Sequence, residues 1–365
     1  MSTMKIITIV CWIITAIVLI GLGIWFLTGS MVFGIKSDRW NLNLNSGFNI
    51  GDWEALSGPY EAVGVYTPGI EGINSLNINW VAGDVTVKPY DGKDFQITEF
   101  AQRELQDHEK LQINTANGTM TIKYRNSDAS LRMPQKKLEV LIPQTLSKNL
   151  NKLSADTVSG DIFVDSINTD ILDADSMSGT IQISNSNSQT LNMNSTSGSL
   201  TVEFVLSENM SMDSMSGDVQ ISGSTAKTLD CGTTSGNVNI TGAFDSMNLS
   251  SMSGEVSVDN STAGSAVKAG NTSGSLELSG SFDTVDSSTM SGKVSITSVV
   301  VPRKLKADST SGDITVTIPN DGEITVNHSS TSGRFSSDIP VVIQEREAQF
   351  EISSMSGDTR ILKLR

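Results

Sequence analysis

The chain has little of what catalysis and covalent cross-linking require. Its 365 residues include only 2 histidines, 2 cysteines, 8 prolines and 5% aromatic residues. His108 and His328 have no cysteine or carboxylate cluster beside them at metal-ligand spacing. Cys11 lies in an apolar run and Cys231 in a repeat, so the sequence predicts no disulfide framework.

Recognisable catalytic and cofactor-binding motifs are also missing. The sequence has no G-x-S-x-G, no P-loop, no G-x-G-x-x-G after a strand and no calcium-binding nonapeptide repeat. We therefore predict no catalytic, cofactor-binding or metal-binding residue, no cofactor and no enzymatic activity.

Positive charge is scarce as well. The chain carries 25 Lys and Arg against 40 Asp and Glu, for a net charge of −15. Such an acidic surface disfavours nucleic acid as a partner and keeps a β-rich protein soluble.

One long apolar run stands out near the N-terminus. Ile6 to Leu27 carries no charge and, as a helix, spans about 33 Å, which matches a hydrocarbon core of about 30 Å. A cleaved signal peptide is the alternative, but the run is long for one and no A-x-A-like site follows closely. We predict an uncleaved single-pass anchor in residues 1–28, a juxtamembrane linker in 29–72, and an extracytoplasmic C-terminal domain.

A Ser-Gly dipeptide recurs through the rest of the chain every 18 to 24 residues. A near-fixed period of this length is typical of a solenoid. The glycines are Gly160, Gly179, Gly198, Gly217, Gly236, Gly254, Gly274, Gly292, Gly312, Gly333 and Gly357.

Apolar residues recur at fixed offsets from these glycines. The residue seven positions before each glycine is apolar, as in Leu172 and Leu191, and so are most residues two and four positions after it, as in Ile181 and Ile183. Alternation on both sides of a glycine predicts two short strands per rung, each with one buried face. The prediction is an all-β solenoid of about 19–20 residues per rung, with glycine at a sharp bend. A two-sheet antiparallel array with a 38-residue unit is the competing fold.

Residues 73–150 are predicted to form an irregular β cap before the regular solenoid of 151–365. Leu76, Ile78 and Trp80 alternate ahead of Gly83 like an early copy of the repeat, and Asn117-Gly118 indicates a hairpin turn. Two segments, Asp107 to Lys110 and Arg132 to Lys137, are interpreted as charged loops. Residues 334–350 interrupt the last copy and are interpreted as part of a C-terminal cap.

Two further positions of the repeat vary in an orderly way. Two residues before each glycine, Met and Thr alternate through most of the array, which indicates either a two-rung packing unit or an exposed methionine stripe that binds a partner. The residue after each glycine is often acidic, as in Asp161, Asp218 and Glu255. Two facing carboxylates there would be needed for a glycan-active enzyme.

Three segments carry a resemblance to a known family: Asn79–Val87, Leu138–Pro143 and Ser159–Val164. From Ile73 to Arg365 the chain resembles the bacterial "putative adhesin" proteins with β-strand repeats, a group of unknown function that includes LiaG-like membrane proteins. The resemblance implies a membrane-tethered extracytoplasmic β-solenoid, sometimes linked to envelope stress, and it supplies no catalytic residues.

The function predicted from all of this is non-enzymatic. We expect a membrane-anchored adhesin or cell-envelope interaction scaffold that contacts the membrane through Ile6 to Leu27 and a protein or cell-wall partner through its repeats. Two alternatives stay open: an accessory component of an envelope-stress response, and a glycan-active β-helix enzyme.

Overall fold

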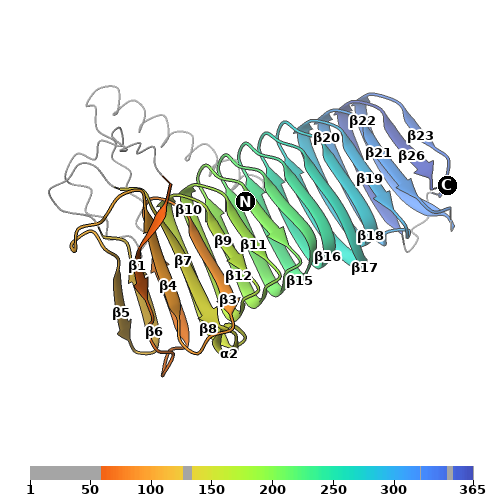
Figure 1. Cartoon of the computed structure of the whole chain (residues 1–365). Helices are drawn as coiled ribbons and strands as arrows, with labels where there is room; N and C mark the ends of the chain where they lie inside the picture. The colour runs from red at the N-terminus through yellow and green to blue at the C-terminus, as the bar shows by residue number, and fades with distance from the viewer. Residues whose placement is uncertain (1–58, 126–133, 321, 343–347, 365) are drawn as a thin grey trace, which may run out of the picture. The chain divides into compact units, whose positions relative to one another are not determined.

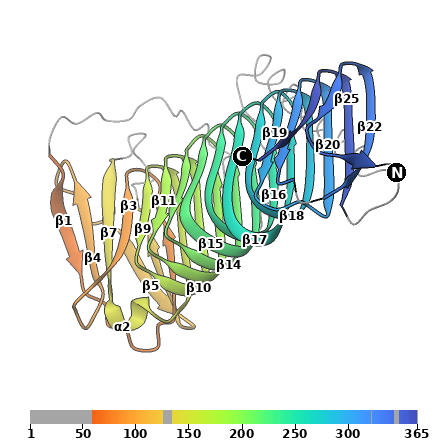
Figure 2. The ribbon, with the colours of Figure 1, turned by 90° about the vertical axis from the view of Figure 1, so that its right-hand side faces the viewer.

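The computed structural model describes residues 59–125, 134–320, 322–342 and 348–364. In these residues nearly every regular element is a β-strand, most strands stack in parallel rungs, and the regular rungs follow one another along the chain (Figures 1 and 2). The predicted all-β solenoid is therefore confirmed. The predicted anchor, Ile6 to Leu27, lies outside the described residues, and within them no helix is long and apolar enough to cross a membrane.

Each regular rung has one strand before the Ser-Gly corner and one after it. The strands before the corner are β8 (Leu150–Ser159), β10 (Asn168–Ser178), β12 (Asn187–Ser195), β14 (Leu206–Ser214) and β20 (Lys304–Ser311). The strands after it are β9 (Ile162–Asp165), β11 (Ile181–Ser184), β13 (Leu200–Glu203), β19 (Val294–Ser298) and β21 (Ile314–Ile318). Four longer strands run from one corner to the next: β15 (Val219–Thr233), β16 (Val238–Ser251), β17 (Val256–Asn271) and β18 (Leu276–Ser291).

Equivalent residues of successive rungs lie in register. Leu172 of β10 pairs with Leu153 on one side and with Leu191 on the other, and both pairings are parallel. Each column of the sequence repeat is thus a column in space, and the alternating apolar positions form one continuous core. The competing antiparallel array is wrong, because each Ser-Gly dipeptide joins two strands of one rung, and the strands of successive rungs pair in parallel.

The corner glycines are required by a close backbone approach. A Cβ on Gly217 would lie 1.9 Å from the carbonyl oxygen of Gly198, and the same conflict recurs at every corner glycine from Gly160 to Gly357. Most of these glycines have no left-handed φ. The expected bend is present at these corners, but most of them do not require a left-handed glycine: what excludes a side chain is the neighbouring rung.

A hydroxyl three residues before the glycine completes the central corners. Ser214 Oγ accepts a hydrogen bond from the Gly217 N–H at 2.9 Å and donates to the Gly198 carbonyl at 3.2 Å. Towards the ends of the stack the strands continue as far as the serine before the glycine, and the buried hydroxyls of Ser176 and Ser309 have no partner.

The second turn of the rung alternates between large apolar and small polar residues. Ile167, Val205, Phe244 and Phe282 are buried there, and the polar residue of the next rung bonds their backbone. The Ser186 hydroxyl, for example, accepts the Ile167 N–H at 3.1 Å. The packing unit is therefore two rungs, because a large side chain fits beside a small one.

The N-terminal rungs are out of sequence order. β2 (Ser75–Asn79) and β3 (Val85–Tyr90) lie between the first regular rung, β8 and β9, and a rung made by β6 (Thr119–Lys123) and β7 (Lys136–Pro143). Three antiparallel strands then close this end: β5 (Gln112–Ala116) on β6, β4 (Gln96–Ala101) on β7, and β1 (Glu61–Tyr66) on β4. A short helix, α2 (Gln144–Ser147), follows β7. The β5–β6 turn confirms the predicted Asn117-Gly118 hairpin.

The C-terminal rungs are out of sequence order too. β25 (Gln349–Ser356) and β26 (Thr359–Lys363) insert between β20–β21 and the rung of β22 (Ile324–Ser332) and β23 (Phe335–Ser337). β24 (Val341–Val342) pairs with β22 on the outer side. Hence the copy of the repeat that has Phe335 and Ser337 at the usually aliphatic positions forms the outermost parallel rung. Its apolar side chains have a neighbouring rung on one side only.

Candidate functional site

The two histidines lie in different parts of the fold. His108 is exposed in the turn before β5, and His328 is half-buried in β22, against the Phe335 ring at 4.8 Å. His328 occupies the repeat position of Ile352, the buried residue that pairs with it in the neighbouring rung. Among the residues that the structure describes, no group of three or more His, Cys, Asp or Glu could hold a metal ion.

The acidic residues after the glycines bind backbone in the next rung. Asp161 Oδ1 accepts the Thr180 N–H at 2.8 Å, and Asp218 Oδ1 accepts the Asn237 N–H at 2.8 Å. Asn237 in turn accepts the Glu255 N–H at 2.9 Å, so it separates Asp218 from Glu255. These side chains hydrogen-bond the corner of one rung to the corner of the next. This structural role accounts for their recurrence after the glycines.

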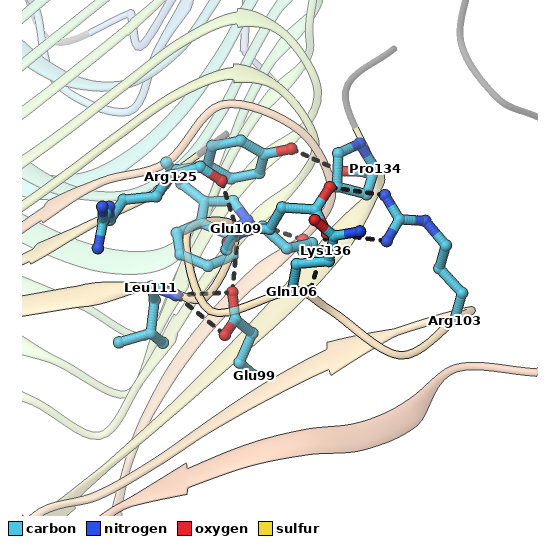
Figure 3. Close-up of polar contacts among 10 residues, drawn as sticks. Glu99, Arg103, Gln106, Glu109, Leu111, Arg125, Pro134 and Lys136 are labelled. Atoms are coloured by element: carbon cyan, nitrogen blue, oxygen red, sulfur yellow. Dashed lines mark hydrogen bonds and ion pairs between the residues drawn. The ribbon is translucent and has the colours of Figure 1, made fainter. Parts of the chain in front are cut away.

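The densest polar cluster lies in the N-terminal rungs (Figure 3). Lys136 Nζ lies 2.8 Å from Glu99 Oε1, and both side chains are fully buried. The ammonium also donates to the Glu109 carbonyl at 2.6 Å and to the Arg125 carbonyl at 3.1 Å. It lies 4.0 Å from the Tyr124 ring centroid. Burial lowers the pKa of Lys136, while Glu99 opposes that effect.

A second ion pair borders this cluster. Arg103 makes a two-point contact with the Glu109 carboxylate at 2.8 and 2.9 Å. The hydrogen bond from Arg103 lowers the pKa of Glu109 to about 2. The Leu111 N–H donates to both oxygens of Glu99, and Trp80 Nε1 donates to the Lys136 carbonyl at 2.8 Å. The Glu99–Lys136 pair has many internal partners and fully buried side chains, and it connects β4 to β7.

The sequence interpretation missed this cluster. Lys136 and Glu109 fall in segments interpreted as charged loops. That interpretation is wrong for Lys136, which begins β7, whereas Glu109 does lie in a turn but has a buried side chain. A signal was present: Lys136 is in phase with Leu138 and Val140, and Glu99 with Ile97, on the buried faces of β7 and β4. A charge on the apolar face of a strand indicates a buried ionic partner.

The methionines before the corner glycines are exposed. The exposed fractions of Met177, Met215, Met252, Met290 and Met355 are 51%, 53%, 43%, 61% and 61%. Packing between rungs, one of the two interpretations of the Met–Thr alternation, is therefore wrong for these side chains. The two-rung unit itself is present at the buried second turn.

An open groove of about 370 Å³ lies on the turns between β8, β10 and β12. Its walls are polar, and their amides pair from rung to rung: Asn187 Nδ2 donates to Asn168 Oδ1 at 3.0 Å, and Gln189 Nε2 to Asp170 Oδ1 at 2.9 Å. Ser188 and Ser207 continue the line, with their hydroxyl oxygens 3.2 Å apart. This groove is a ladder of hydroxyl and amide groups without an enclosed chamber.

Comparison with known proteins identifies the family. The model of the Toastrack DUF4097 family matches residues 73–246 and again residues 243–362, so the chain belongs to that family. The predicted resemblance to a group of unknown function is thereby confirmed. No curated protein matches the chain.

Similar solved structures include three from Parabacteroides species. A "putative adhesin" from Parabacteroides distasonis is 13% identical, with 84% of this chain and 98% of that one covered and a TM-score of 0.39. A "putative adhesin" from Parabacteroides merdae is 11% identical, with coverages of 81% and 95% and a TM-score of 0.42. A "putative lipid binding protein" from Parabacteroides distasonis is 16% identical, with coverages of 83% and 97% and a TM-score of 0.39.

Proposed function

We propose that this member of the Toastrack DUF4097 family is a non-enzymatic, membrane-anchored scaffold of the cell envelope, with adhesin-like contacts made by its repeats. In this proposal residues 1–28 anchor the chain, the predicted linker of 29–72 connects it up to β1, β1 and residues 73–150 cap the stack, and 151–365 stand outside the membrane. The partner is a protein or a cell-wall polymer.

The observation that carries the proposal is the alignment of surface side chains from rung to rung. Asn192 donates to Asp173 at 2.8 Å and Asn194 to Asp175 at 2.7 Å, so the same polar groups recur along one face. A partner with its own repeat could bind such a face through many weak contacts, whose effects multiply. The amide groove on β8, β10 and β12 offers the same chemistry in a hollowed form.

The apolar run supports the membrane part of the proposal. Ile6 to Leu27 has the length and composition of a spanning helix. The acidic net charge of −15 suits a domain that stays in solution beside an anionic surface rather than adhering to it.

Cell fractionation with protease protection tests location and anchoring. The full chain, tagged at its C-terminus, should sediment with membranes, and added protease should digest the tag on protoplasts without lysis. Ile17→Lys should release the protein from the membrane fraction, because a charge at the centre of a span is costly. A tag protected until lysis would contradict the proposal.

Binding to isolated cell walls and to envelope proteins tests the contact itself. Asn168→Ala with Asn187→Ala should weaken retention by either partner, while Asn239→Ala, an exposed amide of β16 that lies after the corner and outside these columns, serves as the control. Equal retention of both variants and the parent would place the contact elsewhere. Hydrolysis of wall glycan by the purified chain would instead favour the enzyme alternative.

A further inference from the structure

The exposed methionines form one continuous line with the threonines between them. We call this line the Met–Thr stripe. In spatial order it consists of Met177, Thr196, Met215, Thr234, Met252, Thr272, Met290, Thr310, Met355 and Thr331. Exposure is specific to the stripe: among the described methionines, the others, such as Met193 and Met212, are buried. Apolar side chains lined up on the surface of a soluble domain indicate a contact site.

The alternation is complete only in space. Along the sequence it fails at the end, where Thr310 is followed by Thr331 and then Met355. In the fold, β25 lies between β20 and β22, with Ser354 paired to Ser309 on one side and to Ser330 on the other. Met355 therefore lies between Thr310 and Thr331. An alternation copied by simple duplication of rungs would follow the sequence instead.

Internal packing does not account for this alternation. At the second turn, large and small residues alternate because they are buried against each other, as Ile167 and Ser186 are. The Met–Thr stripe is outside the core, so its alternation shapes the solvent-facing surface. It presents a methionine about every 9.6 Å, two rungs of about 4.8 Å each.

A second copy of the chain matches this spacing without adjustment, because its rungs have the same rise. The stripe begins with Met177 and ends with Thr331. If two stripes meet antiparallel at full overlap, every methionine faces a threonine, and Met177 faces Thr331 of the other copy. Parallel stripes at full overlap would set methionine against methionine.

In the six central rungs, the residues beside the stripe have the same symmetry. Four positions before the glycine, on the same outward face, the central rungs carry only small uncharged residues: Gly232, Ser250, Gly270 and Ser288. Asp213 and Asp308 flank them at equal distances in rungs. The centre of this arrangement lies between Met252 and Thr272, which is also the centre of the stripe. Small residues there allow two stripes to approach closely.

We propose that the Met–Thr stripe is the interface of an antiparallel two-fold homodimer, with the methionines of each copy seated over the threonines of the other. The contact is isologous, so it closes at two chains. Burial of the methionine side chains drives association, and their flexibility lets them fit the spaces. This goes beyond the proposed function and does not depend on it.

Mass measurement of the full chain in mild detergent, by light scattering across a dilution series, tests the association. We expect a dimer that Met252→Lys weakens at least tenfold, and that Met252→Lys with Met290→Lys abolishes. Leu206→Lys is the control, because Leu206 is also an exposed apolar residue but lies away from the stripe. Unchanged circular dichroism melting shows that the variants are folded. A parent that stays monomeric at all concentrations overturns the proposal.

Disulfide trapping tests the direction. In a Cys11→Ser background, chains with Met177→Cys are mixed with chains with Thr331→Cys; Cys231 is buried and stays unreactive. We expect cross-linked pairs in the mixture and few in either chain alone. Met177→Cys chains that link mainly to each other would overturn the antiparallel arrangement. Monomers that bind neutral phosphatidylcholine vesicles, and lose this with Met252→Lys, would assign the stripe to lipid.

Discussion

Gly217 lies so close to Gly198 in the neighbouring rung that a Cβ on it would be 1.9 Å from that residue's carbonyl oxygen. Gly217→Ala must therefore push two rungs apart. We expect a loss of about 1–3 kcal/mol or more, as for other overpacked sites, and a melting temperature lower by at least about 3 °C. Thermal unfolding followed by circular dichroism measures it.

Gly270 is the matched control for this substitution. It lies in a strand of the same stack, has no left-handed φ, and its Cβ would meet nothing nearer than Ser288 Oγ at 3.8 Å. Gly270→Ala should leave the melting temperature unchanged or slightly raised. Similar losses at both positions would refute the close-approach explanation.

Ser214 and Ser176 occupy equivalent positions in the repeat, but only the Ser214 hydroxyl is hydrogen-bonded. Ser214→Ala removes the acceptor of the Gly217 N–H and the donor to the Gly198 carbonyl, and leaves both groups buried. We expect a cost of about 1–3 kcal/mol in chemical unfolding. Ser176→Ala removes a buried hydroxyl without a partner and should cost nothing or stabilise. If Ser176→Ala lowered stability more than Ser214→Ala, the hydrogen bonds of the Ser214 hydroxyl would not be what stabilises the corner.

Lys136→Met should be among the most damaging substitutions in the chain. It leaves the Glu99 carboxylate buried without its ammonium partner, which costs about 3–5 kcal/mol in comparable sites. Lys88→Met breaks the Lys88–Glu139 pair, 2.7 Å long but partly exposed, and should change stability by no more than about 1 kcal/mol. Urea denaturation of the two variants makes the comparison, and equal effects would contradict it.

Acid should loosen the N-terminal rungs. Arg103 lowers the pKa of Glu109 in the folded chain to about 2, below the usual value of 4.5. The stability that this ion pair contributes is complete above about pH 4.5 and is lost as the pH falls towards 2. Arg103→Gln should flatten the dependence of the unfolding free energy on pH within that window. If the unfolding free energy of Arg103→Gln depended on pH as that of the parent does, the Arg103–Glu109 ion pair would not be the cause of the acid sensitivity.

The sequence predicted the parts of the fold that depend on one repeated environment. Leu153, Leu172 and Leu191 face the core because each rung repeats the alternation of the last, so a pattern along the chain becomes a column in space. The position of the corner was predicted correctly for the same reason. The reason why glycine is required there was not predicted, because it is a contact between Gly217 and Gly198 of the neighbouring rung, which the local sequence does not reveal.

The ends of the stack were harder to predict, because neighbours there are not successive copies. The sequence places Gly357 after Gly333, whereas the fold places it against Gly312. The spacing of the Ser-Gly dipeptides does not reveal that the last copy inserts between the two copies before it. The exposure of Met252 was equally hidden: a period tells which residues share a column, and only the corner geometry decides whether that column faces solvent.

The inserted rungs also determine when the protein can finish folding. β25 and β26 follow β22 and β23 in the sequence, yet they fill the space between that rung and β20–β21. The outermost rung can therefore dock only after β25 and β26 have been synthesised, however early the middle of the array has formed. A tandem repeat that could otherwise grow one copy at a time during synthesis thus waits for a later segment, and a nascent chain without β25 and β26 keeps an open, association-prone strand edge.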